Sequence, residues 1–119
     1  MDFEIIRNYS LNKPGTSEDL PFDEHTLVIR VASKIFIILP LDTPDRINLK
    51  CDPELAIEYR ELYSGVVPGF HMNKKHWNTV YINEDVKPNE ILKMIDHSYE
   101  IIAAKLSNKD KELLKNNNW

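Results

Sequence analysis

Residues 26–51 read TLVIRVASKIFIILPLDTPDRINLKC, and this stretch determines which fold we expect. It begins with two runs rich in β-branched residues, 26–31 and 35–39, which the short polar break 32–34 separates. Two such runs around a short break are typical of a β-hairpin. The clean alternation of polar and apolar residues over 46–51 then predicts a third strand.

Alternation also assigns the two faces of this third strand. Successive side chains of a strand point to opposite sides, so the apolar residues share one face. The polar residues share the other face: Arg46, Asn48 and Lys50. Residues 66–70 and 78–82 predict a second hairpin whose connecting segment, 71–77, is basic. Pro68 places the first arm of this hairpin at an edge of the sheet or in an irregular strand.

Three helices are expected around these strands, each with a recognisable start. Asp2 and Asp52 can accept hydrogen bonds from the unpaired amides of a first helical turn, and Pro53 suits the first helical position. Pro88 opens the longest helix, whose apolar residues recur at helical spacing along one stripe. Residues 16–25 are expected to be an acidic connector.

These elements predict an α+β protein with two layers, in which a single twisted antiparallel sheet packs against helices. We expect one domain over residues 1–119. Its polar C-terminal tail, 107–119, is expected to be frayed or to form a short extra helical turn.

Composition and charge narrow the classes of function. Fifteen Lys and Arg against nineteen Asp and Glu leave a net charge of −4, which is not the bulk charge of a general nucleic-acid binder. No apolar run is long enough to span a bilayer, and the acidic start is unlike a signal peptide. A single cysteine favours a reducing compartment, so we expect a cytoplasmic protein without a membrane partner.

Residues that could support catalysis or bind a metal do not form a recognisable set. No nucleophile has a placed base, and no ligand spacing matches a zinc, iron or calcium site. Asp96 and His97 point about 100° apart on a helix, and His97 is expected to face solvent. Ser98 is expected to bond a local carbonyl, and Cys51 to be a buried, inert thiol. We therefore expect no enzymatic activity, no cofactor and no metal.

The least ordinary segment is 66–83, which contains neither Asp nor Glu although the whole chain is acidic. Lysines at a hairpin tip can pair with phosphates, asparagines can bind base edges, and tryptophan can stack on a base. Lysines also protect sheet edges from aggregation, and aromatic residues often pack on a sheet face. The residue pattern by itself favours this second, structural role.

Three motifs carry a resemblance to a known family. They are RINLKCDPELA (46–56), VPGFHMNKKHWNTV (67–80) and IDHSY (95–99). With these motifs the chain strongly resembles the MmcQ/YjbR family of small bacterial proteins, up to about Leu106. Pro14-Gly15 and residues 18–22 also fit the N-terminal pattern of that family.

The resemblance implies a CyaY (frataxin)-like fold, with a twisted antiparallel sheet backed by helices. The family is commonly described as DNA-binding, on the idea that paired hairpins act as a double wing. On this chain the wings would be the hairpin around Ser33-Lys34 and the hairpin around 73–76. Kinship with frataxin does not bring iron with it, because a fold does not carry a function.

The leading hypothesis is therefore that the chain is a small, non-enzymatic DNA-binding protein. A regulatory role is one option for such a protein. The residues expected to bind nucleic acid are Lys34, Arg46, Asn48, Lys50, His71, Asn73, Lys74, Lys75, His76, Trp77 and Asn78. Asn73 and Asn78 would bind bases or sugars, and Lys74 and Lys75 would bind phosphates.

Two competing hypotheses stay open. The chain could be a module that binds a protein or a small anionic ligand and has no nucleic-acid role. Its ligand would lie on the open face of the sheet, among four residues: Arg46, His71, Trp77 and Tyr81. Alternatively, Asn73 and His76 only brace the hairpin. A concave site would favour the ligand, and a protruding hairpin with outward lysines would favour phosphate contact.

Overall fold

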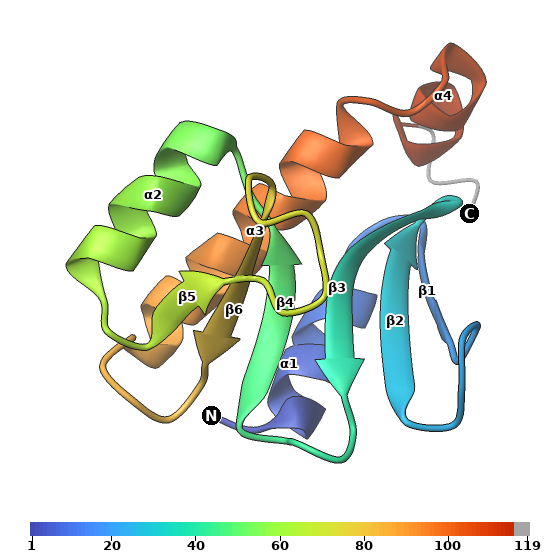
Figure 1. The fold of residues 1–119 in the computed structure, drawn as a ribbon. Helices are drawn as coiled ribbons and strands as arrows, with labels where there is room; N and C mark the ends of the chain where they lie inside the picture. The colour runs from blue at the N-terminus through green and yellow to red at the C-terminus, as the bar shows by residue number, and fades with distance from the viewer. Residues whose placement is uncertain (116–119) are drawn as a thin grey trace.

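The computed structural model describes residues 1–115 of the chain. The strands are β1 (Thr16–Asp19), β2 (Thr26–Val31), β3 (Lys34–Pro40), β4 (Arg46–Lys50), β5 (Val66–Pro68) and β6 (Trp77–Tyr81). The helices are α1 (Phe3–Leu11), α2 (Pro53–Leu62), α3 (Pro88–Ala103) and α4 (Asn108–Lys115). All strand pairs are antiparallel, and they form one sheet in the order β1-β2-β3-β4-β6-β5 (Figure 1).

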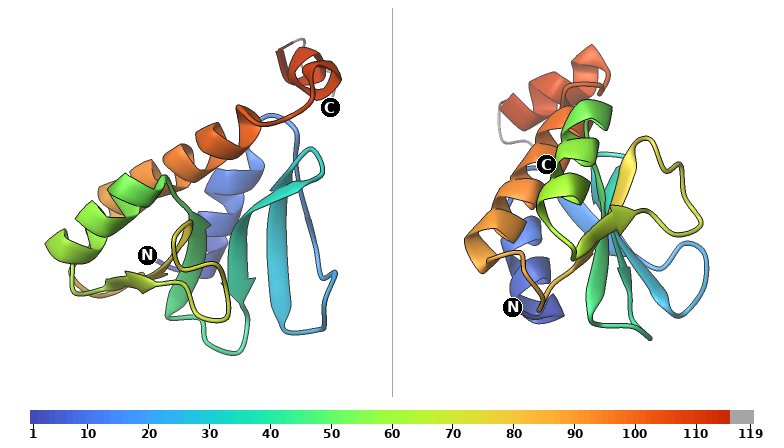
Figure 2. Two further views of the ribbon diagram at one scale, coloured as in Figure 1. Left: turned by 45° about the horizontal axis from the view of Figure 1, so that its top comes forward. Right: turned by 60° about the vertical axis from the view of Figure 1, so that its left-hand side comes forward.

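The predicted α+β architecture is confirmed. Helices α1, α2 and α3 lie on one side of the twisted sheet, and the connections β1–β2 and β5–β6 project from the other side (Figure 2). We call the side away from the helices the open face. β5 is an edge strand, as its proline predicted, because a residue without an N–H cannot pair on both sides.

Helices α1 and α2 begin directly after the predicted capping residues, Asp2 and Asp52. The side chain of Asp2 accepts a hydrogen bond from the amide of Ile5, and that of Asp52 accepts from the amides of Glu54 and Leu55. Pro88 occupies the first turn of α3. Within residues 1–115, no helix is both long enough and apolar enough to cross a membrane.

The prediction for residues 16–25 was incomplete. Thr16–Asp19 form the short edge strand β1, which pairs with β2. A four-residue edge strand of sequence TSED has no buried face to impose an apolar pattern, so nothing in the sequence distinguishes it from a loop.

The core lies between the sheet and the helices, and its centre is apolar. Phe36, Ile37 and Ile47 are fully buried there, and Ile91 and Ile95 cover them from α3. The apolar residues of β4 face this core, as the alternation predicted. On α2, Ala56 is the buried residue, whereas Leu62 is 68% exposed.

The C-terminal tail is more helical than expected. Asn108–Lys115 form α4, which begins after Ser107, whose hydroxyl accepts from the amide of Asp110. The rest of the predicted tail, 116–119, lies outside the described residues.

Candidate functional site

The two predicted wings lie at the same end of the sheet. β3 begins at Lys34, β4 ends at Lys50 and β6 begins at Trp77. Because adjacent strands are antiparallel, these three positions share one end, which is uppermost in Figure 1. Five lysines gather at this end of the sheet, which we call the basic end: Lys34, Lys50, Lys74, Lys75 and Lys105.

Lys50 lies at the centre of the basic end. Its Nζ is 5.5 Å from the centre of the Trp77 ring, which is within the range of a cation–π contact. Burial lowers the pKa of Lys50, and the positive charges of Lys105 and Lys34 lower it further. Among residues 1–115, none of the five lysines is ion-paired with a carboxylate. Their charges therefore remain available to an external anion.

The opposite end of the sheet is acidic. Four connections meet there, 20–25, 41–45, 63–65 and 82–87. They carry six carboxylates: Asp23, Glu24, Asp42, Asp45, Glu84 and Asp85. In the segments that connect elements at the basic end, the one carboxylate belongs to Asp52, which is engaged as the cap of α2. The connecting segments at the two ends of the sheet therefore differ in charge, although the chain as a whole has a net charge of −4.

The loop 69–76 is tied to α2 by Arg60. The Nε of Arg60 donates to the Oδ1 of Asn78 at 2.6 Å, and its Nη2 donates to the carbonyls of Lys74 and Trp77. Nothing in the sequence indicated this role for Arg60, because no sequence pattern connects a helical arginine with a loop that follows it in the chain.

Two predicted binding residues mainly serve this loop. The Oδ1 of Asn73 accepts from the amide of Lys75 at 2.9 Å, and its carbonyl accepts from the amides of His76 and Trp77. The Nζ of Lys74 donates to the carbonyl of Gly69 at 3.2 Å. These bonds support the bracing role for Asn73, and they leave Lys75 as the outward lysine of the pair.

Asn78 does not reach the surface. Its side chain is 2% exposed; its Oδ1 accepts from Arg60, and its Nδ2 donates to the carbonyl of Ala56. Asn78 lies on the helix side of β6, so its amide cannot bind a base or a sugar in this structure. The motif position is explained by the link between β6 and α2, and we leave Asn78 out of the candidate surface.

A hydrogen-bonded chain crosses the open face of the sheet. The Oγ1 of Thr79 donates to the Oδ1 of Asn48 at 2.6 Å and accepts from the amide of Phe70 at 3.3 Å. Asn48 and Thr79 are register partners on β4 and β6, and both are buried, although they lie on the open face. They are buried because the start of the loop 69–76 folds over them.

Beside this chain lies a hollow of about 360 Å³. It is lined by Pro40, Thr43, Arg46, Asn48, Phe70 and His71. Of the four residues expected to converge on a ligand, Arg46 and His71 line it. Tyr81 instead supports the guanidinium of Arg46, which lies 4.9 Å from the centre of its ring, and Trp77 lies under Lys50 at the basic end.

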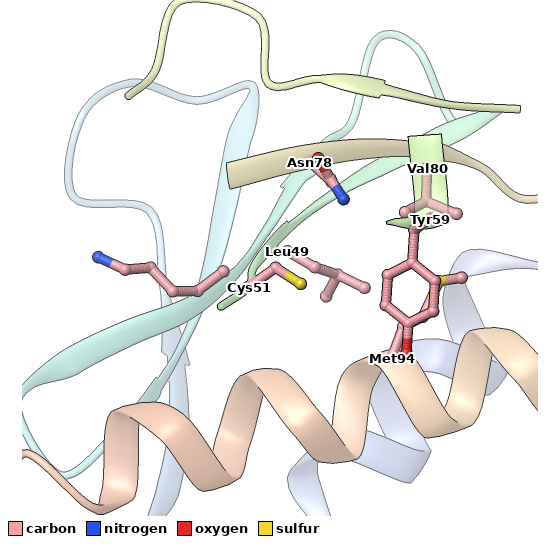
Figure 3. A pocket seen from close by; sticks show the side chains of 7 residues that line it. Leu49, Cys51, Tyr59, Asn78, Val80 and Met94 are labelled. Carbon is pink, nitrogen blue, oxygen red and sulfur yellow. The ribbon is translucent and has the colours of Figure 1, made fainter. Parts of the chain in front are cut away.

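A second cavity, between the sheet and the helices, is part of the core. Its volume is about 10 Å³, and Figure 3 shows Cys51, Leu49, Val80, Tyr59 and Met94 around it. A space of this size is at the lower limit for one water molecule, and most of its wall is apolar. It is a packing defect that is too small for an organic ligand.

Cys51 is expected to be unreactive in the native protein. It is 4% exposed, and burial, with the nearby charge of Asp52 in addition, raises the pKa of its thiol to about 12. Because the thiolate is the reactive form, a disulfide reagent at mildly alkaline pH should modify the native protein at least about 100-fold more slowly than the urea-unfolded chain. Spectrophotometric thiol titration measures both rates, and comparable rates would show that the thiol is accessible.

The remaining candidates for chemistry have structural partners. His97 does not simply face solvent: its Nε2 accepts from the amide of Asp52 at 3.1 Å. Ser98 is fully buried, and its hydroxyl donates to the carbonyl of Phe36 on β3, so its partner is not a local carbonyl. Among the described residues, no three His, Cys, Asp or Glu side chains converge as a metal site.

Known proteins are similar to this chain in sequence and in fold. The family model YjbR matches residues 11–101. The uncharacterised protein YjbR of Escherichia coli K12 is 30% identical over 115 residues, which cover 96% of this chain and 98% of that protein. The uncharacterised protein YyaQ of Bacillus subtilis is also 30% identical, over 82% of this chain and 95% of its own length.

Solved structures agree with the architecture described above. The crystal structure of Deinococcus radiodurans protein DR2400 superposes with a TM-score of 0.87 at 29% identity, covering 94% of this chain and 86% of that one. A crystal structure of a protein from Pseudomonas syringae gives a TM-score of 0.71 at 27% identity, over 85% of this chain and 98% of the other.

Proposed function

The chain belongs to the YjbR family, and for this member we propose a non-enzymatic role in binding nucleic acid through its basic end. The observation that carries the proposal is the separation of charge along the sheet. Five lysines without ion pairs among residues 1–115 gather at one end, while six carboxylates occupy the loops at the other. A chain with a net charge of −4 can attract a polyanion only in such an arrangement.

The lysines of the basic end come from both hairpins. Lys34 follows the turn of the β2–β3 hairpin, and Lys75 lies in the loop of the β5–β6 hairpin. Lys50 lies between them, with its ammonium group above the Trp77 ring. Phosphates along a nucleic-acid strand can therefore be contacted from two protruding loops and from the strand end between them, which corresponds to the double-wing hypothesis.

The same charges predict how strongly salt should affect binding. Each phosphate neutralised by a lysine releases condensed counterions, so four or five contacts with duplex DNA give a slope of log K against log salt of about −3.5 to −4.5. The carboxylates elsewhere on the molecule repel the rest of the nucleic acid. Binding is expected to be weak and strongly salt-dependent, with little preference for sequence, because lysines contact the phosphates and do not read the bases.

A double variant of the two wings tests the proposal. Lys34→Ala with Lys75→Ala removes one exposed lysine from each hairpin. We expect this variant to bind DNA at least about 10-fold more weakly, with a salt slope smaller by about 2. The measurement is fluorescence anisotropy of labelled duplex and single-stranded DNA at salt concentrations of about 50 and 200 mM.

The matched control is Lys87→Ala with Lys93→Ala, which makes the same change of net charge away from the basic end. Its affinity should stay within about twofold of the parent. Equal losses in the two double variants would show that only the total charge matters. An absence of binding by the parent protein at low salt would refute the proposal outright.

A further inference from the structure

The hollow on the open face has the features of a ligand site that is independent of the basic end. Its floor is formed by β4 through Arg46 and Asn48, and its rim is formed by Phe70 and His71 of the loop. We propose that it binds a small monoanion in which a carboxylate is joined to a planar, apolar body. Its volume of about 360 Å³ lies within the range of small-molecule sites.

Asn48 is the residue that would select a ligand with a hydrogen-bond acceptor. It is only 9% exposed, and its Oδ1 is held by the hydroxyl of Thr79. The Thr79 hydroxyl oxygen also accepts from the amide of Phe70, and its proton goes to the Oδ1 of Asn48, so the Nδ2 of Asn48 points away from Thr79. The Nδ2 has no hydrogen-bond partner among residues 1–115, so it offers its two N–H groups to a ligand in the hollow that Asn48 lines.

Arg46 supplies positive charge next to this donor. Asp45 binds its Nε at 2.8 Å and its Nη2 at 3.2 Å, and Tyr81 supports the plane of the guanidinium. Nη1 has no partner among the described residues, so it faces no competitor for an incoming oxygen. Because Asp45 already neutralises part of the charge, the site suits a single negative charge better than a phosphate dianion.

The rim supplies the apolar contact. Phe70 is 48% exposed, which is high for a phenylalanine in a loop that hydrogen bonds hold in place. His71, the next residue, has a positive φ of 58°, a conformation that non-glycine residues seldom adopt and that often occurs at binding sites. Phe70, His71 and Pro40 all line the hollow, so their rings can contact a planar apolar group.

Three probe molecules separate the parts of the proposed ligand. Benzoate has the carboxylate and the planar body, benzamide has the body without the charge, and acetate has the charge without the body. We expect benzoate to shift the side-chain amide signals of Asn48 in a saturable way, with a dissociation constant of about 1 mM or lower. Benzamide and acetate should each bind at least about 10-fold more weakly.

The decisive variant is Asn48→Asp. An aspartate has nearly the shape of asparagine and keeps the oxygen that accepts from Thr79, but it replaces the N–H donors with a negative charge. We expect the affinity for benzoate, followed by NMR shifts of Phe70 and His71, to fall at least about 10-fold. The control Asn89→Asp makes the same change at an exposed position of α3 and should leave the affinity within about twofold.

The outcomes distinguish this inference from the proposed function. Equal binding of benzoate and benzamide, equal affinity of Asn48→Asp and the parent, or no saturable shift below about 10 mM would each overturn the ligand site. None of these results depends on DNA. The lysine variants of the basic end leave the lining of the hollow intact, so each proposal can fail without the other.

Discussion

Replacing Arg60 with alanine is expected to lower the free energy of unfolding by about 2–4 kcal/mol, because it removes charged hydrogen bonds and leaves a buried acceptor without its strongest partner. Arg60 is the donor to Asn78 and to two carbonyls at the end of the loop 69–76. Asn78 is 2% exposed, so water cannot replace the lost donor. Urea unfolding followed by circular dichroism gives the change in stability.

The same substitution should loosen one loop in particular. Amide hydrogen exchange of residues 73–77 is expected to accelerate more than exchange in β2 or β3, because the lost bonds connect that segment to α2. Arg60→Lys keeps the charge but not the forked geometry, and it should recover less than half of the lost stability. An Arg60→Ala protein as stable as the parent, with unchanged exchange, would show that the loop is held by its own turn.

Replacing Phe36 with alanine is expected to have the largest effect on stability, about 3–5 kcal/mol, because it opens a cavity at the centre of the core. Phe36 is fully buried, and its ring meets that of Tyr99 edge-on, with 5.5 Å between the ring centres. The loss is a large fraction of the 5–15 kcal/mol by which a typical domain of roughly this size is stable. Thermal and urea unfolding measure it.

Phe36→Leu is the matched control for this prediction. Leucine keeps most of the apolar volume and loses the aromatic contact with Tyr99, so its cost should be about 1–2 kcal/mol. The hydrogen bond from Ser98 goes to the backbone carbonyl of residue 36 and is available in both variants. Similar losses for alanine and leucine would show that the core closes around the missing ring.

The loop 69–76 links the two proposed sites. It presents Lys75 at the basic end and places Phe70 and His71 over the hollow. The bonds from Arg60 hold its last residues, and the bond from Phe70 to Thr79 holds its start. An Arg60→Ala protein should therefore lose affinity for DNA more than for benzoate, since the bonds it loses lie at the lysine end of the loop.

Local patterns in the sequence predicted most of the fold. The β-branched runs, the alternation over 46–51 and the capping residues Asp2 and Asp52 each act over a few neighbouring residues, so their effects are visible without the tertiary structure. The edge strand β1 was not predicted, because its extended conformation depends on pairing with β2 and no apolar alternation in its own sequence indicates a strand. The resemblance to the YjbR family was likewise evident from contiguous motifs, and the family match confirms it.

The sites depend on contacts that sequence patterns do not encode. Asn78 stands in the same motif as Lys75, yet the pleat of β6 turns its amide into the core. Lys105 and Lys34 are far apart in the chain, and only the packing of α3 on the antiparallel strands brings their charges to Lys50.

By itself, the sequence determined the order of the elements apart from β1 and α4, the face that β4 buries and the family. Only the tertiary structure decided which polar residues are buried, which lysines gather at one end and where the open face is hollow. The physical reason is range: helix caps and strand alternation act between neighbours in the chain, whereas burial and electrostatic fields depend on distances in space.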